Sequence, residues 1–127
     1  MGKNNKKTIL VVEDNELSMR LFTDLLEYNG YKVLRAEDGG EGVDIARECN
    51  PNLILMDIRL PKLSGYSAIE EIKKIKQLQN TPIVAVTAFA MSGDEARIRK
   101  LGVDAYLSKP VPVDLFLETV ERFAEAI

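Results

Sequence analysis

The sequence predicts an α/β fold: a doubly wound, five-stranded parallel sheet whose helices complete a (βα)5 three-layer sandwich. Two observations support this prediction. The chain has 127 residues, which is the size of one ordinary domain. Short apolar runs alternate with longer amphipathic stretches five times along it. Strands that alternate with helices favour a parallel sheet covered by helices on both faces, and such strands are apolar almost throughout.

The first half of the chain contains three predicted strands. Residues 8–12 are almost all apolar and β-branched, as in a strand that is buried on both faces. Leucines at helical spacing follow, and Asn29-Gly30 is a typical C-terminal stop for that helix. Residues 32–36 form a more polar strand, which suits the edge of a sheet, and a short helix is expected over residues 41–48. The apolar run at residues 53–56 is the third strand.

The second half continues the alternation. Ser67-Ala-Ile-Glu70 matches a capping box, so a helix is expected to begin there. Residues 82–86 form the fourth strand, and a second capping box at Ser92-Gly-Asp-Glu95 opens the next helix. A short fifth strand over residues 105–108 precedes a final helix, whose first turn suits Pro112. Right-handed crossovers then favour the strand order 2-1-3-4-5, the flavodoxin-like arrangement.

The composition excludes several classes of function. The chain has no histidine, which excludes Ser-His-Asp catalysis and histidine-ligated zinc. Its one cysteine, Cys49, cannot form an internal disulfide and is expected to be buried or half-buried. The net charge of −3 makes nucleic acid a poor partner, and no apolar run approaches the ~18 residues of a membrane span. We expect a cytoplasmic protein with a basic segment over residues 1–7 and one domain over 8–127.

Side chains that can perform chemistry follow four of the five predicted strands. They are Glu13 and Asp14 after the first, Asp57 after the third, Thr87 after the fourth and Lys109 after the fifth. In the order 2-1-3-4-5 these four strands are neighbours. Ligands of such sheets bind outside the carboxyl ends of the strands. We therefore expect these five side chains to share one site.

The residue types at this site indicate metal-assisted phosphoryl chemistry. Three carboxylates that lie together repel one another, and a hard dication relieves that repulsion. Mg²⁺ prefers oxygen ligands of this kind, and Mn²⁺ is a plausible substitute. Lys109 and Thr87 are suited to holding phosphoryl oxygens, since one is a compact positive charge and the other a hydroxyl donor. Asp57 is then the natural nucleophile for a covalent aspartyl phosphate.

Each of these signals has an ordinary structural alternative. An acid pair after a strand often marks only the N-cap region of the next helix, with Asp14 or Asn15 as the capping residue. Leu17, Leu21 and Phe22 either meet a helical partner or pack in the core. The joint occurrence of the polar residues at consecutive strand ends is the stronger argument for a site.

Four motifs together resemble the receiver domain of two-component response regulators, over essentially the whole chain. They are Val11-Val-Glu-Asp14, Leu55-Met-Asp-Ile-Arg-Leu-Pro-Lys-Leu-Ser-Gly65, Val86-Thr-Ala88 and Lys109-Pro110. Within that family the chain is most similar to single-domain regulators of the bacterial cell cycle, through residues 13–22 and 84–95. The resemblance implies a protein that signals by phosphorylation-dependent contacts with other proteins.

The resemblance also implies a role for each site residue. Asp57 would accept a phosphoryl group from a histidine of a partner kinase or phosphotransferase. Mg²⁺ would be bound by Glu13, Asp14, Asp57 and the main-chain carbonyl of Arg59. Thr87 and Lys109 would hold the phosphoryl oxygens, and Tyr106 would turn inward when Thr87 moves. The Lys109-Pro110 peptide would be cis, and downstream partners would bind the face formed by the fourth helix, fifth strand and fifth helix.

Other functions on the same fold fit less well. An aspartyl-phosphate hydrolase of the haloacid-dehalogenase type would carry an Asp-x-Asp motif after its first strand, whereas Glu13 and Asp14 are adjacent. A flavin or nucleotide binder would need a glycine- or hydroxyl-rich loop where these acids stand. A phosphate-independent interaction module would not need the set of Asp57, Thr87 and Lys109. We therefore expect a phosphoacceptor that takes part in its own phosphorylation and dephosphorylation, and not a conventional enzyme.

Overall fold

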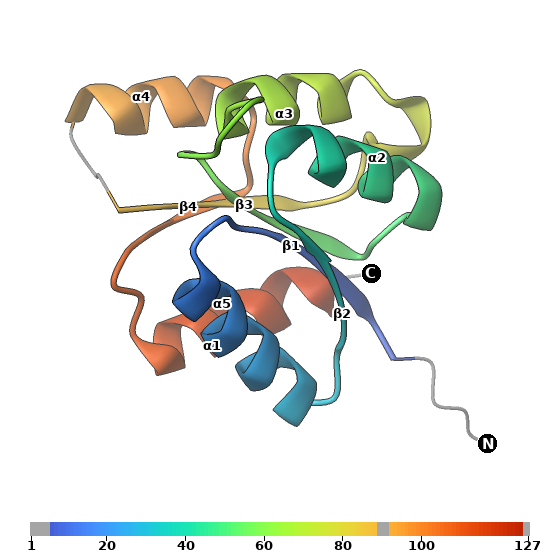
Figure 1. The fold of residues 1–127 in the computed structure, drawn as a ribbon, viewed down its shortest axis with the longest axis vertical. Coiled ribbons are helices and arrows are strands. Elements are labelled where there is room, and N and C mark those ends of the chain that lie inside the picture. Colours follow the sequence, from blue (N-terminus) through green and yellow to red (C-terminus); the bar gives the residue numbers. More distant parts are fainter. Residues whose placement is uncertain (1–5, 89–91, 126–127) are drawn as a thin grey trace.

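The structure confirms the predicted fold class and strand order. It is a computed structural model that describes residues 6–88 and 92–125. A five-stranded sheet in the order β2-β1-β3-β4-β5 has all its neighbouring strands parallel. The strands are β1 (Thr8–Val12), β2 (Lys32–Ala36), β3 (Leu53–Asp57), β4 (Ile83–Thr87) and β5 (Ala105–Ser108). The carboxyl ends of the strands lie on the left of Figure 1.

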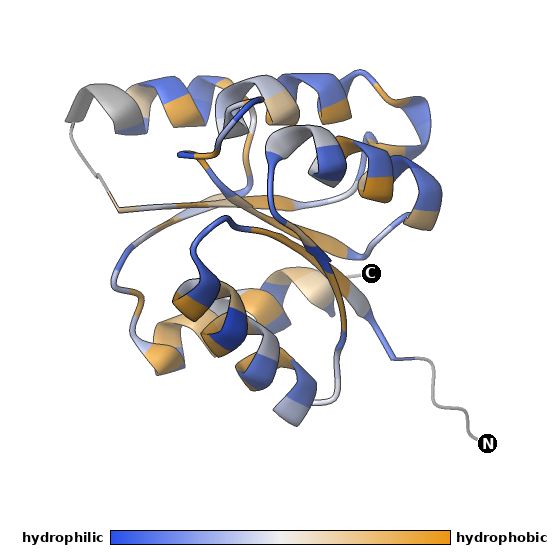
Figure 2. Cartoon of the chain, in the orientation of Figure 1, coloured by the Kyte–Doolittle hydropathy of each residue, from blue (hydrophilic) through white to orange (hydrophobic). Residues whose placement is uncertain are grey.

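Helices cover both faces of this sheet (Figure 1). One face carries α1 (Glu16–Tyr28) and α5 (Val113–Ala124), and the other carries α2 (Gly39–Cys49), α3 (Gly65–Lys73) and α4 (Ser92–Lys100). A short 3-10 helix, η1 (Lys76–Leu78), follows α3. Figure 2 shows the apolar colour concentrated along the strands and on helix surfaces that face them. None of the helices in residues 6–88 and 92–125 has the length and hydropathy needed to cross a membrane.

Two apolar cores lie on either side of the sheet, because alternate strand residues face opposite layers. On the α1 and α5 side, Phe22 stacks on Phe116 with ring centroids 4.7 Å apart. On the opposite side the core includes Ile54, Met56 and residues of α2, α3 and α4. The two central strands β3 and β4 are buried at every position, whereas β2 at the edge is partly exposed, as its more polar sequence predicts.

Three local predictions differ from the structure. The helix α3 is capped by Ser64, whose hydroxyl accepts from the Ser67 N–H at 3.3 Å, so Ser67 lies inside the helix and is not its cap. The helix α2 begins at Gly39, two residues before the predicted start, because Asp38 accepts from the Glu41 N–H. Cys49 is exposed, where we expected burial, because it ends α2 on the solvent side. The second predicted capping box, Ser92-Gly-Asp-Glu95, falls at the start of α4, and the side chains of residues 92–94 are outside what the structure describes.

The apolar residues of α1 were predicted either to pack in the core or to meet a helical partner, and the structure shows which of them are buried. Phe22 is buried in the core, whereas Leu17 is 79% exposed and Leu21 is 48% exposed. The remaining large exposed apolar side chains of the described residues are Tyr28, Val113 and Leu115. All five therefore belong to the α1 and α5 layer.

Candidate functional site

The candidate site lies at the carboxyl ends of β1, β3, β4 and β5. The strand register explains why residues far apart in sequence meet there. Val12 pairs with Met56 and Asp57 pairs with Val86, so the residues that follow these strands emerge at one edge of the sheet. The Lys109 N–H donates to the Thr87 carbonyl at 2.8 Å, which extends the β4–β5 pairing by one residue and brings Lys109 to the same edge.

Glu13 and Asp14 are not needed to cap the helix that follows them. Asn15 is the N-cap of α1, and its side chain accepts from the Ser18 N–H at 2.9 Å. Glu13 is only 2% exposed, and Asp14 beside it is exposed. One Glu13 oxygen accepts from the Asn15 N–H at 3.0 Å. Asn15 therefore caps the helix, as one of the structural alternatives allowed, and both acids remain available to the site.

Asp57 is a buried carboxylate held from two sides. It is 5% exposed, and its Oδ1 accepts from the Arg59 N–H at 3.0 Å. Its Oδ2 lies 3.2 Å from the Lys109 Nζ. The same ammonium lies 2.7 Å from the Glu13 Oε1. Lys109 thus links two carboxylates that come from different strands, as predicted from the strand ends.

Burial and close charges shift the proton affinities of this cluster. Burial is the main cause that raises the pKa of Glu13 from 4.5 to about 7, and the nearby Asp57 charge adds to it, while the hydrogen bond from Lys109 opposes it. Burial alone would lower the pKa of the Lys109 ammonium, but its contacts with Glu13 and Asp57 outweigh that effect, so its pKa lies above the ordinary value. The cluster therefore binds the Glu13 proton more tightly than water-exposed surroundings would.

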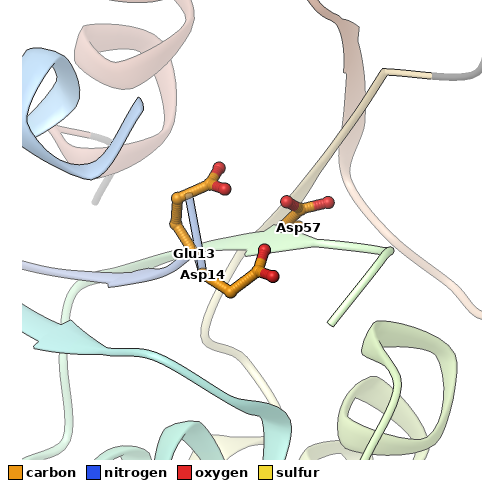
Figure 3. Close-up of side chains that lie close together, drawn as sticks. All are labelled: Glu13, Asp14 and Asp57. Carbon is orange, nitrogen blue, oxygen red and sulfur yellow. The ribbon is translucent and has the colours of Figure 1, made fainter. Parts of the chain in front are cut away.

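The three acids also form a group that fits a hard cation. Glu13, Asp14 and Asp57 each offer one carboxylate oxygen, and these oxygens lie within 4.8 Å of one another. Figure 3 shows the carboxylates of Asp14 and Asp57 facing each other, with Glu13 beside them. All three donors are oxygens, and the chain has no histidine, so the donor set suits Mg²⁺ or Mn²⁺ and not a soft metal.

Thr87 and Arg59 lie on the open side of the acidic group. Together with Asp14 they line a pocket of about 590 Å³, which continues to Tyr66 on α3 and Arg97 on α4. Thr87 itself is 2% exposed at the end of β4. The structure therefore brings Thr87 to the same edge as Asp14, as the sequence predicted.

Tyr106 lies on β5, two residues before the end of that strand. Its ring packs against the core between the sheet and the α2, α3 and α4 layer. Its hydroxyl is buried and has no hydrogen-bond partner among the described residues. The Lys109-Pro110 peptide is cis, as the resemblance implied.

Comparison with known proteins identifies the family. The model of the response regulator receiver domain matches residues 9–121. The chain belongs to this family. It is 50% identical to the polar-differentiation response regulator DivK of Brucella ovis over 117 residues, which cover 92% of this chain and 95% of that protein. The DivK protein of Brucella anthropi matches to the same extent.

Solved receiver domains share the same fold. The receiver domain of a sensor histidine kinase from Pseudomonas aeruginosa superposes with a TM-score of 0.89 at 35% identity, covering 95% of this chain and 99% of that one. That structure contains a magnesium ion coordinated in its active-site cleft. A CheY-like receiver domain from Methanospirillum hungatei gives a TM-score of 0.88 at 30% identity, covering 95% of both chains. This receiver domain is therefore a signalling protein of the two-component type.

Two glycines, Gly39 and Gly65, contact the site loop and are not identifiable as site residues from the sequence. Both lie in close contact with the backbone between β3 and α3. A glycine at the first position of a helix beside a functional loop was the available signal, but a single sequence does not reveal which backbone that glycine approaches.

Proposed function

We propose that Asp57 accepts a phosphoryl group from a histidine of a partner kinase or histidine phosphotransferase, in a Mg²⁺-dependent reaction in the cytoplasm. The phosphorylated receiver then signals through contacts with other proteins, in bacterial cell-cycle or cell-division control. The observation that carries this proposal is the contact of Lys109 Nζ with Asp57 at 3.2 Å, beside two further carboxylates. The 50% identity to DivK proteins supports the cellular role.

The chemical step needs a nucleophile and a donor. An Asp57 carboxylate oxygen forms a bond to phosphorus while the phosphorus–nitrogen bond of the donor histidine breaks, and the imidazole leaves. The chain has no histidine, so this donor comes from another protein. Burial of Asp57 excludes most water from the nucleophile, and the Arg59 N–H and the Lys109 ammonium fix the carboxylate in one orientation.

The residues that would hold the metal are Glu13, Asp14, Asp57 and the Arg59 main-chain carbonyl. When bound, Mg²⁺ supplies charge neutralisation for the phosphoryl oxygens and so lowers the repulsion between them and the acids. Lys109 provides a second positive charge on the other side of Asp57. Glu13 has to release its proton to act as a ligand, and its pKa of about 7 makes metal binding stronger as the pH rises through neutrality.

The contacts that a phosphoryl group would form provide enough free energy to shift the protein between two conformations. It adds roughly −1.5 to −2 charges and recruits charge-assisted hydrogen bonds, each of which contributes about 1.5–3 kcal/mol. Two such bonds, from the Thr87 hydroxyl and the Lys109 ammonium, give about 3–6 kcal/mol. Moving a two-state equilibrium from 1:99 to 99:1 takes about 5.5 kcal/mol. In this proposal the movement of Thr87 is transmitted to Tyr106, and α4, β5 and α5 form the face that downstream partners bind.

The upstream partner binds the layer formed by α1 and α5. Leu17 and Leu21 are exposed on α1, and α1 begins three residues after Glu13, so a partner on these residues lies next to the acidic group. An apolar helical surface is the expected contact for the helical bundle that presents a kinase or phosphotransferase histidine. Arg20 on the same helix is exposed and adds a polar rim.

Incubation with acetyl phosphate and Mg²⁺, followed by intact mass, tests the proposed function. We expect one phosphoryl adduct on the native chain, released by hydroxylamine, and none on Asp57→Asn, which keeps the shape of the side chain but removes the nucleophile. Asp44→Asn on the exposed face of α2 is the matched control and should label like the native chain. An adduct of equal yield on Asp57→Asn would refute the assignment.

A further inference from the structure

The loop between β3 and α3, residues 58–64, is held between two glycines. This loop carries Arg59, whose N–H donates to Asp57. Gly65 opens α3 at one end of the loop, and Gly39 opens α2 on its outer side. We propose that Gly39 and Gly65 are positioning residues, which fix this loop by direct backbone packing and so set the place of Asp57 and Arg59 for the metal. The inference rests on the proposed metal-dependent function.

Gly65 packs against the backbone of the phosphoacceptor itself. Its N–H donates to the Ile58 carbonyl at 3.0 Å. A Cβ at this position would overlap the Asp57 carbonyl oxygen and would lie only 2.5 Å from the Ile58 Cα. These atoms belong to the main chain at the end of a buried strand, and they have no rotamer by which to move aside. A side chain at position 65 therefore has to displace Asp57 or the start of α3.

Gly39 holds the same loop from the α2 side. A Cβ at this position would overlap the Leu63 carbonyl oxygen and lie 2.9 Å from the Leu63 carbonyl carbon. Gly39 is buried, and its neighbour Asp38 fixes the start of α2 by accepting from the Glu41 N–H at 2.8 Å. The first turn of α2 thus supports the loop backbone, although Gly39 lies 18 positions before Asp57 in the sequence.

The ion pair between the loop and the N-cap of α2 is too weak to replace this packing. Lys62 lies 3.8 Å from Asp38, but its side chain is 81% exposed, and an exposed ion pair contributes about 0–1 kcal/mol. Lys62 also has a φ of 63°, in the left-handed region that non-glycine residues rarely adopt. The loop therefore keeps an unfavourable backbone conformation while supported by two close backbone contacts, which is consistent with a loop whose position matters.

Position 40 provides a matched control. Gly40 is the next residue of α2, and a Cβ there would meet only the Asp38 Oδ1, at 3.4 Å. Alanine at position 40 adds the same methyl group to the same helical turn without touching the loop. Alanine at position 63 is a second control, because it trims the Leu63 side chain and leaves the backbone carbonyl that Gly39 contacts.

The test is a calorimetric titration with Mg²⁺ alone, on the native chain and on Gly39→Ala, Gly65→Ala, Gly40→Ala and Leu63→Ala. Thermal unfolding of each variant checks that it folds. We expect the Mg²⁺ affinity to fall about 10-fold or more in Gly39→Ala and Gly65→Ala, in line with changes to groups that orient metal ligands, and to stay unchanged in both controls. The Mg²⁺ concentration that half-saturates labelling by acetyl phosphate should rise by the same factor.

The outcomes separate this inference from the proposed function. Equal Mg²⁺ affinity in folded Gly39→Ala and Gly40→Ala would overturn the inference, even if both label normally. A native chain that binds Mg²⁺ but takes no phosphoryl group would refute the proposed function. The ratio of the Mg²⁺ affinities of Gly39→Ala and Gly40→Ala would still decide the inference in that case. If both glycine variants fail to unfold cooperatively, Leu63→Ala decides: unchanged affinity supports backbone packing, and a 10-fold loss refutes it.

Discussion

The inner positions of β1, β3 and β4 and the residues at their carboxyl ends are equally buried, but their chemistry is opposite. Leu55 is 1% exposed among apolar neighbours, whereas Asp57, two residues later, is 5% exposed and ionisable. Glu13 and Thr87 repeat this change at the ends of β1 and β4. Burial of apolar groups stabilises the fold, and burial of polar groups costs stability unless they are paired. The contrast indicates that the strand interiors provide stability, whereas the polar strand ends fit the proposed chemistry and not the needs of packing.

Lys109→Ala should have the largest effect on the chemical step. It removes the ammonium that lies within 3.2 Å of both Glu13 and Asp57. Loss of a single positioned donor of this kind costs about 100–1000-fold in rate. We expect phosphorylation by acetyl phosphate to slow by that factor, measured by intact mass over time. Lys74→Ala on the exposed end of α3 is the control, and an equal loss there would show that the effect is not local.

Leu55→Ala should have the opposite effect to Lys109→Ala, with a large loss of stability and little change in the rate of phosphorylation. Removal of a fully buried leucine typically costs about 2–5 kcal/mol. The free energy of unfolding, measured with urea, should fall by that amount, while labelling at a temperature well below the melting point stays near the native rate. Leu17→Ala, on a side chain that is 79% exposed, should change the free energy of unfolding by less than about 0.5 kcal/mol. Equal losses in the two variants would contradict the burial pattern.

Much of this contrast was predictable from the sequence, and its limits have a physical origin. Apolar runs such as residues 53–56 identify buried parallel strands, and the residue after each run identifies the strand end. The partnership of Lys109 with Glu13 spans 96 positions, so it follows from the strand order and not from any local pattern. Ser67-Ala-Ile-Glu70 fits a capping box as well as Ser64 fits an N-cap, and the structure decides between them, because the Ser64 hydroxyl accepts from the Ser67 N–H.

The sequence also could not predict that Glu13 and Asp14 differ in burial. Glu13 and Asp14 are adjacent, and the pattern gave them equal status. The structure buries Glu13 beside Lys109 and exposes Asp14. This difference arises because successive residues at the end of a strand point to opposite sides. Burial raises the pKa of Glu13 above its ordinary value.

Glu13→Gln should act on the pH dependence of stability without metal. The folded pKa of Glu13 is about 7, above its ordinary value of 4.5, so the folded state binds this proton more tightly than the unfolded state does. Its stabilising contribution is complete below 4.5 and is lost as the pH rises through 7. The melting temperature of Glu13→Gln relative to the native chain should therefore increase between about pH 5 and about pH 8. Glu48→Gln on exposed α2 should show no such trend, and a flat difference for Glu13→Gln would contradict the raised pKa.

The identity of the residue that carries the phosphoryl group tests the central claim most directly. After labelling with acetyl phosphate and Mg²⁺, borohydride reduction converts a phosphorylated aspartate to homoserine, which peptide mass spectrometry locates in the sequence. We predict homoserine at position 57 alone. Homoserine at position 14, a reduced product of Glu13, or a phosphoryl group that resists borohydride on Thr87 would contradict it.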